Sequence, residues 1–196
     1  MFSVIPETIE QMNEAYAYKD SIVETIKQKI ESTDDLQYAF ALAGLYLESN
    51  AYGTLLQSWL ERKYGWKNIP QNQNRGDFDT SIHKNVELKI SLDRNDPANK
   101  NWRANLLNLR LDSPVTQYLF ITHKPRTQEI QFFFVPKDDV IYIVDAIHDA
   151  GTRGKHNKEH GEIRLDMYSD IYEQVDANAL SYLQQFSITE DDLRSI

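Results

Sequence analysis

The sequence predicts one domain of mixed α and β structure, in which a mixed central β-sheet is flanked by helices. The first third of the chain has apolar residues at helical spacing, whereas residues 117–122 and 131–135 are short apolar runs typical of strands. The predicted elements follow in the order helix, strand, strand, helix, strand, strand, helix. This order suits a mixed sheet that has helices on its faces.

Three helices are expected before the first strand. Apolar side chains recur at helical spacing over residues 9–31, and residues 32–35 supply an N-cap for a second helix over 36–48. A third helix is expected over 49–64, with Gly65 as its C-terminal cap. We expect the first two helices to pack as a hairpin; the alternative use of their apolar stripe is dimerisation.

The second half of the chain gives mixed signals. Residues 101–111 are helical or mixed in period, and a helix is expected over 136–147 because Pro136 and two acidic residues open it. Residues 162–168 have the pattern of a strand. Two short helices are expected over 177–186 and 189–196.

Composition limits the class of protein. A chain of 196 residues is long enough for one domain with a full core. The sequence has no apolar run of transmembrane length and begins without a secretory signal, so we expect a soluble protein. It contains no cysteine, which removes disulfides and thiolate metal sites and fits the cytoplasm.

One strand-like run, residues 75–89, contains both acidic and basic side chains. Read with a period of two, Asp77 and Asp79 lie on one face of a first strand. After a turn, Glu87 and Lys89 lie on one face of a second strand. A hairpin whose loop has an odd number of residues would bring the carboxylates and the lysine together, and an even loop would separate them. The alternative is a solvated strand face with a cross-strand ion pair.

This combination of side chains points to metal-dependent hydrolysis. Two nearby carboxylates repel each other unless a cation lies between them, and Mg²⁺ prefers such oxygen ligands. Asp77 and Glu87 can supply ligands, with the backbone carbonyl of Leu88 as a third. Lys89 can orient the attacking water and offset charge that develops on phosphorus. The implied reaction is hydrolysis of a phosphodiester.

These residues resemble the PD-(D/E)XK nuclease superfamily, and within it the type II restriction endonucleases. The match is Gly76-Asp77, then nine residues, then Glu87-Leu88-Lys89. The resemblance implies that Asp77 and Glu87 bind Mg²⁺ and that Lys89 assists the attacking water. Gly76 stands where the family pattern often has proline.

Further site residues are implied less directly. Asp79 shares the face of Asp77 and is the alternative metal ligand. The family often has a glutamate near the metals on the preceding helix, and here that helix offers Gln57 and, one turn later, Glu61. The alternative for Gln57 is an ordinary half-exposed polar residue of a helix.

Two polar loops, residues 93–103 and 150–161, are expected to contact DNA, with a solvated surface as the alternative. The formal net charge of −9 is unusual for a DNA-binding protein, but phosphate contact depends on a local patch and on bound cations. The candidate DNA-binding residues are Arg94, Lys100, Arg103, Arg153, Lys155, Asn157 and Lys158.

The resemblance implies a restriction-endonuclease-like fold for a single domain, with an N-terminal helical segment (1–48), a catalytic core (49–170) and C-terminal helices (171–196). It implies a Mg²⁺-dependent type II restriction endonuclease that cuts double-stranded DNA at a specific site, leaves a 5′-phosphate and acts as a homodimer. We expect a prokaryotic or phage-encoded, cytoplasmic protein. The alternatives are a repair, recombination or phage nuclease of the same fold, and a non-catalytic DNA-binding or assembly protein.

Overall fold

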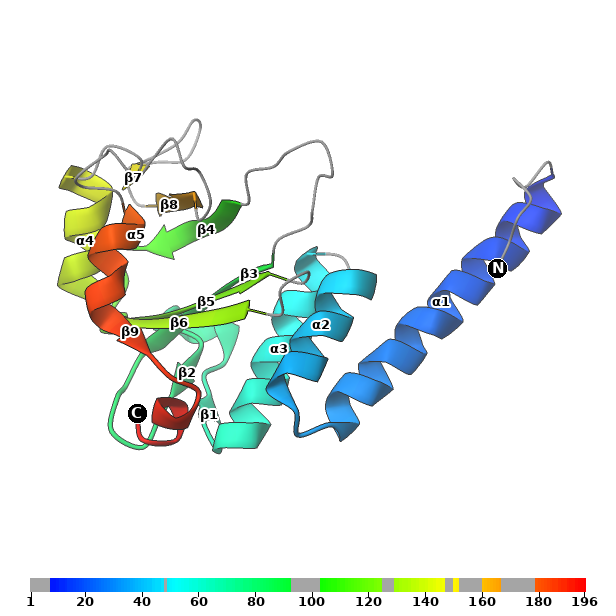
Figure 1. Ribbon diagram of the computed structural model, residues 1–196, viewed down its shortest axis with the longest axis horizontal. Coiled ribbons are helices and arrows are strands. Elements are labelled where there is room, and N and C mark those ends of the chain that lie inside the picture. The colour runs from blue at the N-terminus through cyan, green and yellow to red at the C-terminus, as the bar shows by residue number, and fades with distance from the viewer. Residues whose placement is uncertain are drawn as a thin grey trace.

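The computed structural model describes residues 8–47, 49–92, 103–124, 129–146, 150–151, 160–166 and 179–196. Two sheets and two groups of helices make up this part of the chain (Figure 1). The elements are α1 (Ile9–Ser32), α2 (Leu36–Tyr46), α3 (Ser49–Tyr64), β1 (Lys67–Asn68), η1 (Gln71–Gln73), β2 (Phe78–Asp79), β3 (Val86–Leu92), β4 (Arg103–Arg110), β5 (Gln117–Lys124), β6 (Glu129–Pro136), α4 (Lys137–Ala146), β7 (Ala150–Gly151), β8 (His160–Asp166), α5 (Ala179–Leu183), η2 (Gln184–Phe186), β9 (Ser187–Ile188) and η3 (Asp191–Arg194).

The larger sheet has six strands in the order β1-β2-β3-β5-β6-β9 and is mixed, because β3 and β5 run parallel while the other neighbours run antiparallel. The smaller sheet has the order β4-β8-β7 and is antiparallel. The prediction of a mixed α and β protein with a mixed central sheet is therefore confirmed. The three expected N-terminal helices are present as α1, α2 and α3.

Local sequence explains where these helices begin and end. Thr8 and Gln11 form a capping box at the start of α1, and Asp35 caps α2 by accepting a hydrogen bond from the Tyr38 amide. Gly65, with φ +71°, follows the last residue of α3 in the left-handed conformation that glycine adopts without strain. The predicted N-cap of the second helix, within residues 32–35, and the predicted C-terminal cap of the third helix at residue 65 are thus confirmed.

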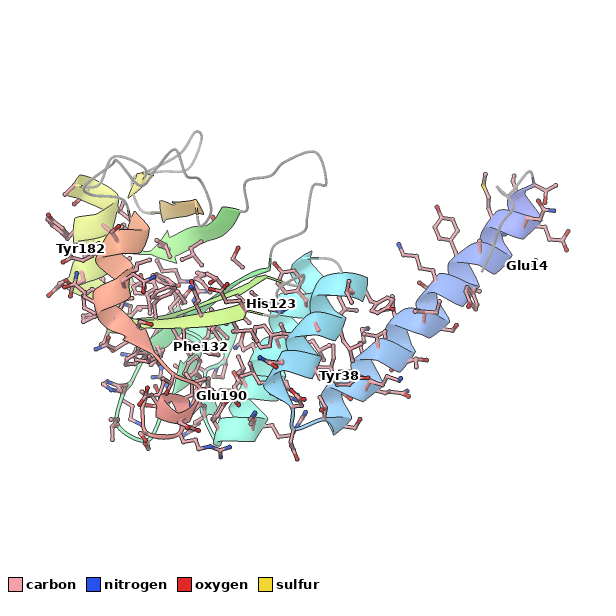
Figure 2. All side chains as sticks on the ribbon, in the orientation of Figure 1. Glu14, Tyr38, His123, Phe132, Tyr182 and Glu190 are labelled. Atoms are coloured by element: carbon pink, nitrogen blue, oxygen red, sulfur yellow. The ribbon has the colours of Figure 1, made fainter. Side chains whose placement is uncertain are left out.

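One face of the six-stranded sheet packs against the N-terminal helices. Phe40 of α2 contacts His123 of β5 edge to face, with ring centroids 5.9 Å apart, at the end of the sheet beside α2 (Figure 2). Trp59 of α3 is buried and donates a hydrogen bond to the Thr33 carbonyl. The sheet residues in this core are Phe78, Val86, Leu88, Leu119, Ile121 and Phe132.

The opposite face packs against α4, α5 and β4. The Tyr182 hydroxyl of α5 donates a 2.8 Å hydrogen bond to Asp139 of α4, so these two helices are joined on this side (Figure 2). The buried residues of this second core are Leu106, Leu109, Val115, Tyr118, Phe120, Phe133, Val135, Val140, Ile143, Val144 and Leu183. A small sheet, and not helices alone, therefore flanks this face.

The interpretation of residues 101–111 as helical or mixed is wrong, because Arg103–Arg110 form strand β4. The ladder with β8 shifts register between Leu106 and Leu109, and Asn108 has φ +56°. An irregularity of this kind lets two residues three positions apart point into the same core. Both leucines are buried, so the strand imitates helical spacing.

The C-terminal part differs in detail from the expected two helices. Between α5 and η3, Ser187–Ile188 form the edge strand β9 beside β6. The expected strand over 162–168 is present as β8. Within the described segments, no helix is both long enough and apolar enough to cross a membrane.

Candidate active site

The chain turns back at β2 and β3 so that Phe78 pairs with Val86. The Asp77 amide donates a 2.8 Å hydrogen bond to the Val86 carbonyl, and the Thr80 amide closes the turn onto the His83 carbonyl at 2.9 Å. Phe78 and Val86 point into the helical core. The hairpin therefore anchors one face in the core while its polar residues stay near the strand edge.

Gly76 is required where the chain enters this hairpin. Its φ is +109°, and a Cβ placed there would lie 2.8 Å from the Val86 carbonyl oxygen. Side chains rarely adopt this φ, and proline is locked near −65°. The proline that is frequent in the resembled family could not occupy this backbone conformation.

Asp77 is held against the next strand by a backbone group. Its Oδ2 accepts a 2.8 Å hydrogen bond from the amide of Leu88. The N–H and C=O of one strand residue point to the same side, so the Leu88 carbonyl is directed to the side on which Asp77 lies. Asp77 and the predicted carbonyl ligand are thus on one side of β3.

Glu87 and Lys89 lie on the face of β3 opposite the helical core, as the alternation predicted. Glu87 is completely buried, and its Oε1 lies 2.6 Å from Nζ of Lys89 and 3.4 Å from Nε of Arg110. Burial raises the pKa of Glu87 above its ordinary value; Lys89 opposes this shift, Asp77 adds to it, and Arg110 opposes it more weakly. Asp77 is bound to the amide of Leu88, the residue next to Glu87, so its negative charge opposes the ionisation of Glu87.

The residues present fit a divalent cation. Oε2 of Glu87 is buried and has no hydrogen-bond partner among the residues described here, and a nearby cation would favour the charged form that burial and Asp77 disfavour. In that part of the chain, no three His, Cys, Asp or Glu side chains gather into a possible metal site. A cation at Asp77 and Glu87 would therefore have two carboxylate ligands, a set typical of Mg²⁺.

Asp79 has a different environment from Asp77, although alternation placed both on one face. Oδ1 of Asp79 accepts a 2.9 Å hydrogen bond from the Asn85 amide and lies 3.3 Å from the Arg75 guanidinium. Burial would raise the pKa of Asp79, but the Asn85 amide and Arg75 outweigh it, so the pKa is lowered. Asp79 thus secures the hairpin loop, which leaves Asp77 as the carboxylate that interacts with Glu87.

Gln57 and Glu61 are engaged with each other. Nε2 of Gln57 donates a 2.9 Å hydrogen bond to Glu61, and the Asn68 amide group donates to the same carboxylate at 3.0 Å. Both residues belong to α3, which packs on the sheet face opposite Glu87. Their supporting role stays a prediction.

Two site residues were not expected from the sequence. Arg110 of β4 binds Glu87 across the two sheets, and Tyr118 of β5 pairs in register with Glu87. Burial raises the pKa of Tyr118, and the charge of Glu87 raises it further. Tyr118 could have been found from the parallel pairing of two strands, whereas Arg110 required β4 to be recognised as a strand.

Most of the predicted DNA-binding residues lie outside the described segments. These are Arg94, Lys100, Arg153, Lys155, Asn157 and Lys158. Arg103 is the first residue of β4, and its backbone pairs with that of Asp166 in β8. The two ends of the 150–161 loop belong to β7 and β8.

No family model matches this chain, and no curated protein matches it.

Proposed function

We propose that this protein is a Mg²⁺-dependent nuclease of the PD-(D/E)XK kind, with a restriction-endonuclease-like fold. The observation that carries the proposal is the placement of Asp77, held by the Leu88 amide, beside the buried Glu87–Lys89 ion pair on the neighbouring strand. Two carboxylates and an amine, one carboxylate directly before β2 and the other two groups on β3, are the groups that metal-assisted phosphodiester hydrolysis needs.

Each residue has a distinct role in this proposal. Asp77 and Glu87, with the Leu88 carbonyl, would hold Mg²⁺, which when bound activates a water and offsets charge on the phosphate. Lys89 orients that water and stabilises negative charge in the transition state. Arg110 binds Glu87 and keeps its carboxylate in place, so we assign it a positioning role.

The proposed substrate is double-stranded DNA, cut at a specific site to leave a 5′-phosphate by a homodimer of the type II restriction kind. Arg103, at the start of β4, belongs to the same strand as Arg110, which contacts Glu87. This common strand supports β4 as the element that links a DNA contact at Arg103 to the site. Recognition of DNA structure or ends by the same cluster is the alternative.

Digestion of a mapped plasmid, with Mg²⁺ or with a chelator, tests the function. Discrete bands that appear only with Mg²⁺ support a site-specific endonuclease. A smear or nicked circles would instead indicate a nuclease that acts on structure or ends. If plasmids and genomic DNA of several different sequences all stay intact under every condition, the nuclease proposal is overturned.

Variants then assign the activity to the cluster. Glu87→Gln and Lys89→Gln should each lower the cleavage rate by at least about 100-fold, while circular dichroism shows a folded protein. Lys27→Gln, at a partly exposed lysine of α1, is the matched control and should cleave as the wild type does. Equal activity in all three variants would place the activity elsewhere.

A second pair separates the two aspartates. Asp77→Asn should abolish cleavage, whereas Asp79→Asn should lower stability and keep cleavage at temperatures where it is folded. The opposite result would make Asp79 the metal ligand.

A further inference from the structure

The N-terminal half of α1 carries an apolar stripe that the rest of the described chain leaves uncovered. Ile9, Met12 and Tyr16 follow one another at helical spacing, and Ile9 and Tyr16 are 77% and 66% exposed. The same stripe continues into Ile26 and Ile30, which are buried in the core. Figure 1 shows this half of α1 extending away from the sheets and beyond α2.

A second uncovered stripe lies on α2. None of the 11 residues of α2 is charged, and a helix that is apolar all round is normally buried on all sides. Tyr38, Ala41 and Leu45 nevertheless lie opposite its buried residues, and Leu45 is 66% exposed. No described segment covers this exposed apolar side of an uncharged helix, and such a surface is typical of a contact with a partner.

The two stripes match each other. Both consist of three residues at positions i, i+3 and i+7, so they have the same length along the helix axis. In an antiparallel arrangement, Met12 lies over the small Ala41. The same arrangement brings Lys19, at the end of the α1 stripe, towards the carboxylate of Asp35 at the start of α2.

We propose that a second copy of this chain covers these stripes, with α1 of each protomer packed on α2 of its partner. Among the described residues, α1 reaches the core of its own chain only through its C-terminal half, so the described part of one chain leaves both stripes uncovered. A two-fold axis pairs both stripes at once, since the same contact occurs twice. The inference deepens the homodimer of the proposed function by naming its interface, and it uses no residue of the proposed nuclease site.

The buried area supports a reciprocal arrangement. A fully covered tyrosine buries roughly 150–250 Å². The large side chains of the two stripes are between 43% and 77% exposed. One such contact therefore hides several hundred Å², on the order of half a standard interface. Two identical contacts reach roughly 1,200 Å², where stable interfaces begin.

Light scattering coupled to size exclusion, on the full chain at about 10 to 50 µM, tests the proposal. We expect a dimer, and Tyr16→Glu or Leu45→Glu should raise its dissociation constant at least about 30-fold. Tyr18→Glu is the matched control, because Tyr18 is also exposed but lies on the other side of α1. A monomeric wild type, or equal effects of Tyr16→Glu and Tyr18→Glu, would overturn the proposal.

The absence of cysteine from the sequence allows a direct test of the contact. When the single variants Met12→Cys and Ala41→Cys are mixed and oxidised, a mixed disulfide dimer should form. Mixing Tyr18→Cys with Ala41→Cys should give at least about tenfold less of it. Equal yields would show that α1 does not dock on α2 through this stripe, even if either glutamate variant failed to fold.

Discussion

The backbone amide of Leu88 donates a 2.8 Å hydrogen bond to Oδ2 of Asp77. Leu88 lies between Glu87 and Lys89 in the sequence, so this bond fixes the position of Asp77 relative to both. Alternation turns the Leu88 side chain into the helical core and turns its two neighbours to the opposite face. Leu88 therefore fixes three polar groups: its amide holds Asp77, and its buried side chain directs Glu87 and Lys89 to the opposite face.

Replacing Asp77 should separate its structural role from its chemical one. In Asp77→Asn the amide oxygen can still accept the Leu88 hydrogen bond, so the free energy of unfolding should change by less than about 0.5 kcal/mol. Asp77→Ala leaves the Leu88 amide without this acceptor and should cost about 1 kcal/mol. Urea unfolding checks this, and equal stabilities for Asn and Ala would contradict a structural role for the bond.

A methyl group at Gly76 should disturb the hairpin. Gly76→Ala places Cβ 2.8 Å from the Val86 carbonyl oxygen at a positive φ, so we expect a loss of about 2 to 3 kcal/mol of stability. Gly53→Ala is the control, because a Cβ at this position in α3 meets no atom within 4 Å. That variant should gain about 0.5 to 1 kcal/mol, as measured by thermal unfolding.

Acidification should reveal the contribution of Asp79. Its folded pKa is below the ordinary 3.8, so the stability it contributes is present above that value and is lost as the pH falls through the folded pKa. Asp79→Ala should cost about 2 kcal/mol at pH 7, because the Asn85 amide and Arg75 lose their acceptor. The difference from wild type should shrink below about pH 4, and a constant difference would contradict this origin.

Mg²⁺ should stabilise the folded protein through Glu87. At ten times its dissociation constant, a ligand of the folded state adds about 1.4 kcal/mol, which should raise the melting temperature of the wild type but not of Glu87→Gln. The effect should fade as the pH falls through the raised pKa of Glu87, above the ordinary 4.5, because a protonated carboxyl loses the charge that binds the cation. An equal Mg²⁺ effect in both proteins would place the cation elsewhere.

Without metal, the same pKa shift acts in the other direction. A raised folded pKa means that protonated Glu87 contributes stability at low pH and that this contribution is lost as the pH rises through the folded value. The metal-free wild type should therefore lose stability relative to Glu87→Gln over that interval.

Arg110 should stabilise the protein only while Glu87 is ionised. Arg110→Gln should cost about 1 to 2 kcal/mol at pH 7.5, since among the described residues it leaves the buried carboxylate paired with Lys89 alone. Arg110→Lys should lose less, because it keeps the positive charge. Urea unfolding at two pH values checks this, and a loss that persists after Glu87 is protonated would show that Arg110 acts through packing alone.

The sequence was sufficient to predict the features that depend on the alternation of side chains along a strand. The faces of Glu87, Lys89 and Leu88 followed from a period of two, because β3 is regular and one of its faces is buried. The N-cap of α2 and the strands β5 and β6 followed from equally local signals. Local signals were sufficient wherever the backbone is regular.

Irregular backbone and long-range pairing account for what was missed. The irregularity between Leu106 and Leu109 disguised β4, and without β4 there was no reason to bring Arg110 to Glu87. The distinct roles of Asp77 and Asp79 depend on the turn around Asn85, which has φ +59° and whose amide captures Asp79. Period alone cannot show which of two alternating acids a turn will bind.

The ion pair between Glu87 and Arg110 connects strands that belong to different sheets. A cation bound through Oε2 would withdraw negative charge from the carboxylate that the Arg110 guanidinium contacts through Oε1, so binding at the site and loosening of the second sheet are thermodynamically linked. Amide hydrogens of β4 would then exchange with solvent faster in the metal-bound protein than in the metal-free protein. Metal binding at β3 could therefore be detected as increased local opening of β4.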